Sequence, residues 1–197
     1  MSVSGRPGLL LDRDGVLNEE CRYLHDPKDL IVIAGTAETI ATINRWGIPV
    51  AVVTNQAGIG RGLYGVDDYL SVNHAIEVVL ARSRAHIDAW YFCPHLPAAG
   101  CSCRKPKPGM LLDAAKDLAM DLGRSVLVGD KESDLAAARA AGCHAVLVRT
   151  GYGRDVESDL QSMNRLDLAD RVSDSLAALL PFLEGKFSRP SQSEFAT

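Results

Sequence analysis

The stretch LLLDRDGVLN, residues 9–18, decides the fold of this chain. Three leucines run directly into Asp12, Arg13 and Asp14, so a buried strand is expected to end in two carboxylates that lie two residues apart. Like charges this close repel each other unless a bound cation offsets them, or a reaction uses one as nucleophile and the other as acid. A strand that simply ends in a polar turn has a similar composition. This stretch alone therefore leaves both interpretations open.

Outward from this stretch, apolar strands alternate with amphipathic helices. Strands are predicted at residues 7–12, 48–55, 88–93, 125–130 and 144–150. Apolar residues recur at helical spacing in five other segments, which predicts helices at residues 36–47, 66–84, 109–123, 133–142 and 173–183. This alternation predicts an α/β domain with a doubly wound, mostly parallel, Rossmann-like sheet that carries helices on both faces.

Length and composition restrict the class of protein. The 197 residues suit one domain, which we place at residues 1–185, followed by a disordered polar tail at residues 186–197. The net charge of −4 argues against general nucleic-acid or membrane binding. No apolar run approaches the roughly 18 residues of a membrane helix, and the N-terminus lacks the apolar core of a signal peptide. We expect a cytoplasmic monomer.

Polar side chains follow three of the predicted strands at the point where each strand ends. Asp12 ends the first strand, Thr54 and Asn55 end the second, and Asp130 ends the strand at residues 125–130. In an open parallel sheet, ligands bind outside the carboxyl ends of the strands. The convergence of carboxylates, a hydroxyl and an amide at one edge predicts a catalytic site there.

Phosphoryl transfer through an aspartyl-phosphate is the chemistry that fits these groups. A carboxylate nucleophile divides hydrolysis into two easier steps, and a second carboxyl can protonate the leaving oxygen and then activate water. Mg²⁺ prefers oxygen ligands and would neutralise the repulsion between a carboxylate and a phosphate. A hydroxyl, backbone N–H groups and a lysine would stabilise the transferred group.

Four stretches, in this order, resemble the motifs of the haloacid dehalogenase-like phosphatases. They are DRDGVLN (12–18), VVTNQ (52–56), the lysine of CRKPKPGM (103–110) and VGDKESD (128–134), and the resemblance covers roughly residues 8 to 150. It implies the fold of that family, a phosphatase activity and a bound Mg²⁺. No substantial insertion interrupts the first two motifs, so we expect no separate cap domain.

The resemblance also implies roles for individual residues. Asp12 is the expected nucleophile and Asp14 the expected general acid and base, while Thr54, Asn55 and Lys105 would hold the phosphoryl group. The Mg²⁺ ligands would be the carboxylates of Asp12 and Asp130 and the backbone carbonyl of Asp14.

Two further residues of the fourth motif have expected roles. Lys131 lies beside the expected metal and is predicted to contact the substrate. Asp134 is interpreted as a helix-start residue in preference to a support for the site.

A cluster of soft ligands lies within the stretch FCPHLPAAGCSCRKPKPGM, residues 92–110. Cys93, His95, Cys101 and Cys103 form the pattern C-x-H-x5-C-x-C, and three thiolates with one imidazole suit tetrahedral Zn²⁺. Four protein ligands leave no position for water, so this zinc would be structural. It would stiffen an irregular loop directly before Lys105.

The zinc loop resembles one branch of the family, which contains heptose bisphosphate phosphatases and histidinol-phosphate phosphatases. The segment TNQAGIGRGLY (54–64) and the late strand HAVLVRTGYG (144–153) are similar to the heptose enzymes. This implies hydrolysis of the 7-phosphate of D-glycero-D-manno-heptose 1,7-bisphosphate, a step of heptose and lipopolysaccharide-precursor biosynthesis. The predicted substrate contacts are Glu20, Tyr23, Asn55, Gln56, Arg104 and Lys131. In the segment 19–23, Cys21 and Arg22 depart from the pattern of those enzymes.

Two other functions stay open at this stage. Histidinol phosphate carries an amine, and Glu19 or Glu20 could pair with it, whereas a bisphosphate needs the extra cations that Arg22, Arg61, Arg104 and Lys107 could supply. The chain could also be a zinc-stabilised module that binds phosphorylated ligands without turnover. Against this, every residue that the reaction needs is present.

Overall fold

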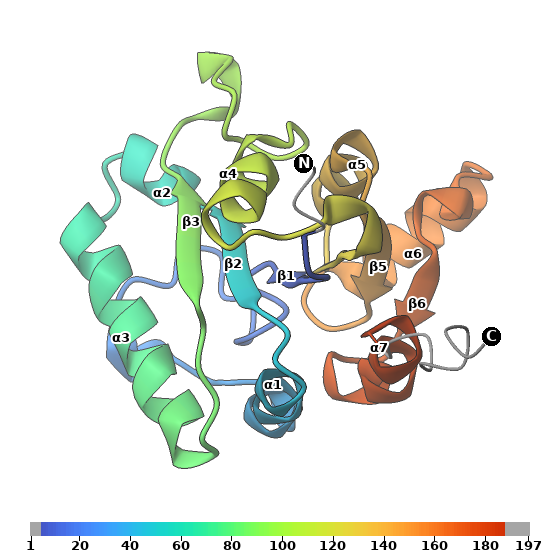
Figure 1. The fold of residues 1–197 in the computed structure, drawn as a ribbon. Helices are drawn as coiled ribbons and strands as arrows, with labels where there is room; N and C mark the ends of the chain where they lie inside the picture. Colours follow the sequence, from blue (N-terminus) through green and yellow to red (C-terminus); the bar gives the residue numbers. More distant parts are fainter. Residues whose placement is uncertain (1–4, 188–197) are drawn as a thin grey trace, which may run out of the picture.

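A computed structural model describes residues 5–187 and shows a parallel sheet of six strands among them (Figure 1). The strands follow the order β3-β2-β1-β4-β5-β6, and Leu10 of β1 pairs with Ala51 of β2 and with Leu127 of β4. Their bounds are β1 Leu9–Leu11, β2 Val50–Asn55, β3 Ala89–Cys93, β4 Val126–Gly129, β5 His144–Val148 and β6 Arg171–Ser173. The predicted doubly wound parallel sheet is confirmed.

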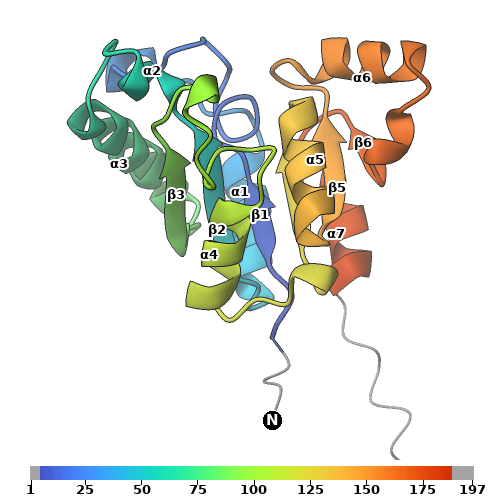
Figure 2. The same ribbon diagram turned by 90° about the horizontal axis from the view of Figure 1, so that it is seen from above.

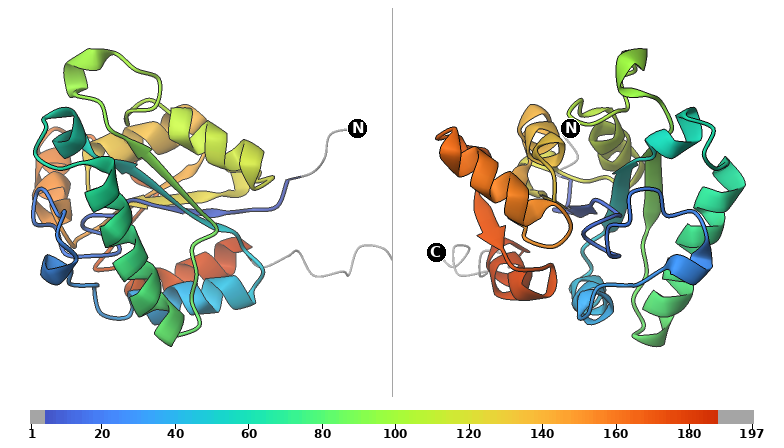
Figure 3. Two further views of the ribbon diagram at one scale, coloured as in Figure 1. Left: turned by 90° about the vertical axis from the view of Figure 1, so that its left-hand side faces the viewer. Right: turned by 180° about the vertical axis from the view of Figure 1, so that it is seen from behind.

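Helices cover both faces of the sheet because its strands are buried on both sides. Leu9 and Leu11 of β1 pack into the core beneath α1, α3 and α7, whereas Leu10 packs into the opposite core beneath α4, α5 and α6. Figure 3 shows these two layers on either side of the strands. The helices are α1 Thr36–Arg45, α2 Ala57–Gly60, α3 Val66–Arg82, α4 Gly109–Asp117, α5 Glu132–Ala141, α6 Gly153–Ser162 and α7 Leu180–Phe187. Short 3-10 helices are η1 Pro27–Asp29, η2 Pro97–Ala99, η3 Leu122–Arg124, η4 Leu166–Leu168 and η5 Ala177–Leu179.

Some predicted elements differ from the observed ones. The helix expected at 109–123 ends at Asp117, because Ala119 takes a left-handed φ of +51° and the Met120 N–H bonds back to the Ala115 carbonyl. The helix expected at 173–183 starts later, because Arg171–Ser173 pairs with β5 as an edge strand. Neither this short, polar strand nor α6 carries a strong apolar pattern, and the sequence did not predict them.

The sheet reverses its order between β1 and β4, which are neighbours while their following strands lie on opposite sides. This is the point at which doubly wound proteins bind ligands. Figure 2 shows β1 entering from the end of the sheet where the N-terminus lies, with α2 and α6 at the opposite end, where the strands finish. The residues that follow β1 and β4 therefore share one site.

The segment 12–35 connects β1 to α1 with only η1 inside it, so the described part of the chain contains no separate cap domain. At the other end, α7 extends to Phe187, two residues beyond the predicted domain boundary. The rest of the predicted disordered tail, residues 188–197, lies outside the described residues. Between residues 5 and 187, no helix is long and apolar enough to span a membrane.

Candidate active site

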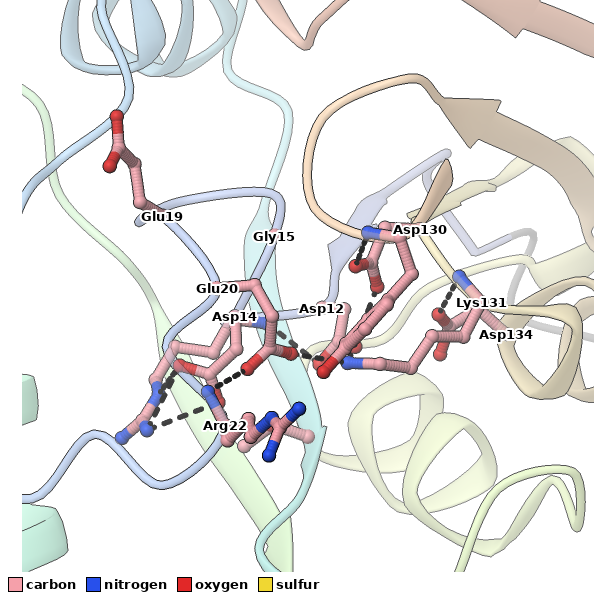
Figure 4. A network of polar contacts seen from close by, with 12 residues as sticks. Asp12, Asp14, Gly15, Glu19, Glu20, Arg22, Asp130, Lys131 and Asp134 are labelled. Carbon is pink, nitrogen blue, oxygen red and sulfur yellow. Dashed lines mark hydrogen bonds and ion pairs between the residues drawn. The ribbon is translucent and has the colours of Figure 1, made fainter. Parts of the chain in front are cut away.

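Asp12 and Asp130 lie side by side at the reversal point of the sheet (Figure 4). Both carboxylates are buried, at 4% and 0% exposure. The Asp12 N–H bonds to the Val128 carbonyl at 2.9 Å and so continues the pairing of β1 with β4. The Arg13 N–H then donates to Asp12 Oδ1 at 2.8 Å. The sheet itself therefore fixes the predicted nucleophile.

Lys105 reaches this cluster from the segment between the predicted zinc loop and α4. Its buried ammonium lies 3.2 Å from Asp12 Oδ1 and 2.5 Å from Asp134 Oδ1, and it donates to the Val53 carbonyl at 2.7 Å. Asn55 holds the backbone of Lys105 through two bonds, because its amide donates to the Lys105 carbonyl and accepts from the Lys105 N–H. The predicted grouping of Asn55 and Lys105 beside Asp12 is found in the structure.

Asp134 has both of the roles that its sequence position allowed, at the start of a helix and in support of the site. Its Oδ2 accepts the Lys131 N–H at 3.0 Å, which caps the start of α5 as expected for a helix-start residue. Its Oδ1 also pairs with Lys105, 29 residues earlier in the chain. Asp134 therefore supports the site as well as the helix, and the preference for the first role alone was too narrow.

The electrostatics of the cluster follow from burial and from these lysines. Burial alone would raise the pKa of Asp12, but the charges of Lys105 and Lys131 outweigh it and hold that pKa below its ordinary value. Burial, with the neighbouring Asp12 and Asp134 charges, raises the pKa of Asp130 to about 7 against the opposing effect of Lys131. Asp12 is thus held ionised, as a nucleophile must be. The charge of Lys131 is not enough to keep the pKa of Asp130 at its ordinary value.

The carboxylates fit a divalent cation. One oxygen each from Asp12, Asp130 and Asp134 lie within 4.8 Å of one another. Asp130 Oδ1 is buried and accepts no hydrogen bond from the described residues, and its ion pair with Lys131 Nζ is long, at 3.5 Å. An oxygen-only donor set of this kind is typical of Mg²⁺ sites.

Two glycines that the sequence did not single out make room for Asp130. Gly15 and Gly151 have φ of +86° and +56°, and a Cβ on either would overlap Asp130 Oδ2. The Tyr152 N–H donates to the same oxygen at 2.9 Å, and the Thr150 hydroxyl bonds to the Gly15 carbonyl. The loop after β5 therefore encloses the site, and only the sheet order brings it there.

Both carboxylate oxygens of Asp14 accept hydrogen bonds. Oδ1 accepts from Arg13 Nε at 3.1 Å and Asn18 at 3.0 Å, and Oδ2 accepts from Arg13 Nη2 at 3.1 Å and Gln56 at 2.9 Å. The Gln56 amide also donates to the Thr54 hydroxyl at 2.9 Å. Gln56 therefore links Asp14 to Thr54. The Gln56 side chain is buried, and its oxygen accepts a hydrogen bond from the Tyr64 hydroxyl. The direct contact of Gln56 with the substrate stays a prediction.

The mouth of the site is a pocket of about 520 Å³ lined by Glu20, Cys21, Arg22, Gly151 and Tyr152. Lys131 stands beside it, 2.8 Å from Glu20 Oε2, with its ammonium 5.0 Å from the centre of the Tyr152 ring. Figure 4 shows Glu20 and Lys131 pointing toward one another near Asp12, whereas Glu19 lies well away from the cluster. Tyr23 is exposed.

The Cys and His side chains of the predicted zinc loop gather in one place between β3 and α4. The Cys93 and Cys101 sulfurs are 3.6 Å apart, Cys93 and Cys103 are 3.2 Å apart, and His95 Nδ1 lies 3.3 Å from the Cys103 sulfur. Tetrahedral ligands about 2.3 Å from zinc are about 3.8 Å from one another. The four residues therefore fit a zinc ion. Arg104 follows the last ligand, and its Nη1 donates to the His95 carbonyl at 3.3 Å.

Known proteins resemble this chain along most of its length. Residues 102–179 match the HAD-hydrolase-like family model. A D-glycero-D-manno-heptose-1,7-bisphosphate 7-phosphatase of Thermosynechococcus vestitus is 40% identical over 190 residues, covering 90% of this chain and 95% of the relative. The corresponding β-anomer phosphatase of Vibrio cholerae is 42% identical over 154 residues, covering 74% of this chain and 83% of the relative.

A solved structure gives the same result. The D,D-heptose 1,7-bisphosphate phosphatase from B. bronchiseptica, in complex with magnesium and phosphate, superposes with a TM-score of 0.83 at 36% identity and covers 91% of this chain and 99% of its own. The family model, the sequence identity and the similarity of the two structures all indicate the same family. The chain belongs to the haloacid dehalogenase-like hydrolases and, within them, to the family of the D-glycero-D-manno-heptose-1,7-bisphosphate 7-phosphatases.

Proposed function

We propose that this protein hydrolyses the 7-phosphate of D-glycero-D-manno-heptose 1,7-bisphosphate and releases the 1-phosphate. The observation that carries the proposal is the buried Asp12 carboxylate, which Lys105 and Lys131 keep ionised at the reversal point of the sheet. The substrate is inferred from relatives that match nearly the whole chain and are phosphatases of this heptose bisphosphate.

The reaction would proceed in two steps. An Asp12 carboxylate oxygen attacks phosphorus, the bond from phosphorus to the C7 oxygen breaks, and the Asp14 carboxyl gives that oxygen its proton. Asp14 then takes a proton from water, whose oxygen attacks the aspartyl-phosphate. Cleavage of the bond to Asp12 releases inorganic phosphate and restores the carboxylate. Lys105 and the Thr54 hydroxyl hold the transferred group.

The residues present fit both expected metals. Asp12, Asp130 and the backbone carbonyl of Asp14 would hold Mg²⁺, which, when bound, offsets the negative charge of the phosphate and the carboxylates. Cys93, His95, Cys101 and Cys103 would hold a structural zinc ion. The zinc loop positions Lys105 through the chain and Arg104 through its bond to the His95 carbonyl.

Purified protein is expected to contain about one zinc per chain, because four soft ligands already lie at zinc-ligand spacing. Cys101→Ser and Cys103→Ser should lose this zinc, melt at a lower temperature and turn over more slowly, since the loop that carries Lys105 loosens. Elemental analysis and thermal unfolding measure both effects. Cys21→Ser, outside the cluster, is the matched control and should keep its zinc. Metal-free wild type with unchanged melting and activity would contradict the zinc site.

Arg104→Ala is expected to lower kcat/KM for the bisphosphate by about 1.5–3 kcal/mol, the range for one charge-assisted hydrogen bond. The half-buried Arg104 is held at the zinc loop, where the second phosphate would lie. 4-Nitrophenyl phosphate has no second anion and should lose much less. The exposed Arg124 precedes β4, at the opposite end of the sheet, so Arg124→Ala is the matched control. Equal losses on both substrates would place Arg104 at the reacting phosphate instead.

The test of the proposed function is a phosphate-release panel with Mg²⁺ that contains both anomers of the heptose bisphosphate and histidinol phosphate. We expect the bisphosphate to be preferred. Glu20 is already paired with Lys131, and Glu19 lies away from the cluster, so neither acid is placed to receive the amine of histidinol phosphate (Figure 4). A preference for histidinol phosphate would overturn the substrate, and absence of any phosphate release would support the non-catalytic module.

We also propose that the protein acts as a monomer in the cytoplasm and binds no nucleic acid. One chain by itself supplies Asp12, Asp14, Lys105 and Asp130, the net charge is −4, and no disulfide links the described cysteines, as suits a reducing compartment. Light scattering of the purified protein tests the oligomeric state.

A further inference from the structure

Arg13 lies between the two catalytic carboxylates in the chain, and the reaction described above does not use it. Its side chain is fully buried, at 0% exposure. A buried guanidinium is costly unless partners satisfy its charge and its five N–H donors. The partners of Arg13 therefore indicate what the residue does.

The guanidinium forms a bidentate pair with the Asp14 carboxylate, which we call the fork. Nε donates to Asp14 Oδ1 and Nη2 to Asp14 Oδ2, both at 3.1 Å. Such bidentate pairs fix orientation as well as charge. Because each Asp14 oxygen also accepts an amide hydrogen, from Asn18 or from Gln56, the carboxylate is bound from several directions.

Three separate parts of the fold hold the fork in place. Nη1 donates to Asn73 Oδ1 of α3 at 3.3 Å, and Nη2 donates to Gln56 Oε1 at 3.3 Å and to the Leu24 carbonyl at 3.4 Å. The guanidinium carbon lies 5.3 Å from the centre of the Tyr69 ring, also on α3. Arg13 therefore fixes Asp14 relative to a helix, to the end of β2 and to the segment after β1.

Asp12 is positioned by different contacts. Its carboxylate accepts the Arg13 backbone N–H and pairs with Lys105, and no contact with the Arg13 side chain is recorded among the described residues. The side chain of Arg13 is thus placed to act on the proton donor and not on the nucleophile.

We propose that Arg13 is a positioning residue for proton transfer: it sets the place of Asp14 and stabilises the carboxylate that remains when the Asp14 proton passes to the leaving oxygen. The proposal rests on the proposed phosphatase function. As the bond from phosphorus to that oxygen breaks, the O–H bond of Asp14 breaks and its electron pair stays on Asp14, inside the guanidinium fork.

The test compares leaving groups in wild type and Arg13→Lys, which keeps the charge and loses the fork. kcat/KM is measured for an alkyl phosphate, phenyl phosphate and 4-nitrophenyl phosphate. We expect a loss of about 10²-fold for the alkyl phosphate, the lower end of general acid catalysis. The loss should shrink to a few-fold for 4-nitrophenyl phosphate, because nitrophenolate departs without a proton.

A second readout is the time course with 4-nitrophenyl phosphate. Arg13→Lys should release a burst of nitrophenolate and then turn over slowly, since the water step still needs Asp14 as base. In an Asp14→Asn background, Arg13→Lys should add little further loss, because both changes remove the same proton transfer.

Two variants separate positioning from stability. Asn73→Ala removes one support of the fork while keeping Arg13, and we expect the same dependence on the leaving group in smaller size. If Arg13→Lys does not fold, Asn73→Ala tests the proposal in its place. Val72→Ala opens the core of α3 beside Asn73, lowers the melting temperature and should show no dependence on the leaving group.

Equal losses on all three substrates for Arg13→Lys and Asn73→Ala, or additivity with Asp14→Asn, would overturn the role of Arg13. That result differs from failure of the proposed function, in which wild type itself would release no phosphate from any substrate.

Discussion

Asp12→Asn is expected to abolish turnover, with a loss on the order of 10⁴-fold or more, the scale seen when a covalent hydrolase loses its nucleophile. The amide oxygen is a poor nucleophile and cannot form the aspartyl-phosphate. The measurement is phosphate release from the heptose bisphosphate and from 4-nitrophenyl phosphate, together with acid trapping of phosphorylated protein, which should be present in wild type and absent in the variant.

The fold of Asp12→Asn should survive, because Lys105 keeps its pair with Asp134 and the Asp12 N–H still bonds to Val128. Thermal unfolding and circular dichroism check this point. Asp159→Asn, an exposed carboxylate of α6, is the matched control and should turn over normally. Normal turnover by folded Asp12→Asn would exclude the proposed mechanism.

Lys105→Met is expected to give the second large effect, on both activity and stability. Lys105 is 2% exposed and is shared by Asp12 and Asp134, so its removal leaves two carboxylates buried without their cation. Breaking a buried ion pair from one side costs about 3–5 kcal/mol of unfolding free energy. Losing one donor to the transferred phosphoryl group lowers kcat by a further factor of about 10² to 10³. Lys116→Met, on the exposed side of α4, is the control for losing a lysine.

The instability of Lys105→Met should grow as the pH rises. In wild type Lys105 helps to hold the pKa of Asp12 below its ordinary value, so Asp12 stabilises the fold at neutral pH and loses this contribution in acid. Without Lys105, burial dominates and raises the pKa of Asp12, as it already raises that of Asp134. A carboxyl whose pKa is raised by folding destabilises the folded state as the pH rises past its unfolded pKa.

Thermal unfolding of wild type and Lys105→Met at about pH 5 and about pH 8, in a chelator that removes Mg²⁺, measures this difference. The gap between the two melting temperatures should be wider at the higher pH. An equal gap at both values would show that the buried carboxylates do not depend on Lys105 for their charge.

The sequence alone determined the sheet and most of its layers. A strand buried on both faces is a short apolar run and an amphipathic helix repeats every three to four residues, so both are visible within ten to fifteen residues of sequence. The edge strand β6 and helix α6 were missed because they bury few apolar side chains and so leave a weak pattern. The cluster that could hold zinc was also predicted from sequence, since its four residues all fall between residues 93 and 103.

The tertiary structure alone decided how the polar groups of the site pair. Lys105 meets Asp134, Lys131 meets Glu20 across 111 residues, and Tyr152 reaches Asp130 from the loop after β5. The fork of Arg13 around Asp14 joins neighbouring residues, yet its burial depends on α3 and the end of β2. A charged side chain looks alike in sequence whether it is solvated or buried. Only the packing of distant segments removes the water around it, and that loss of solvent makes each of these pairs specific.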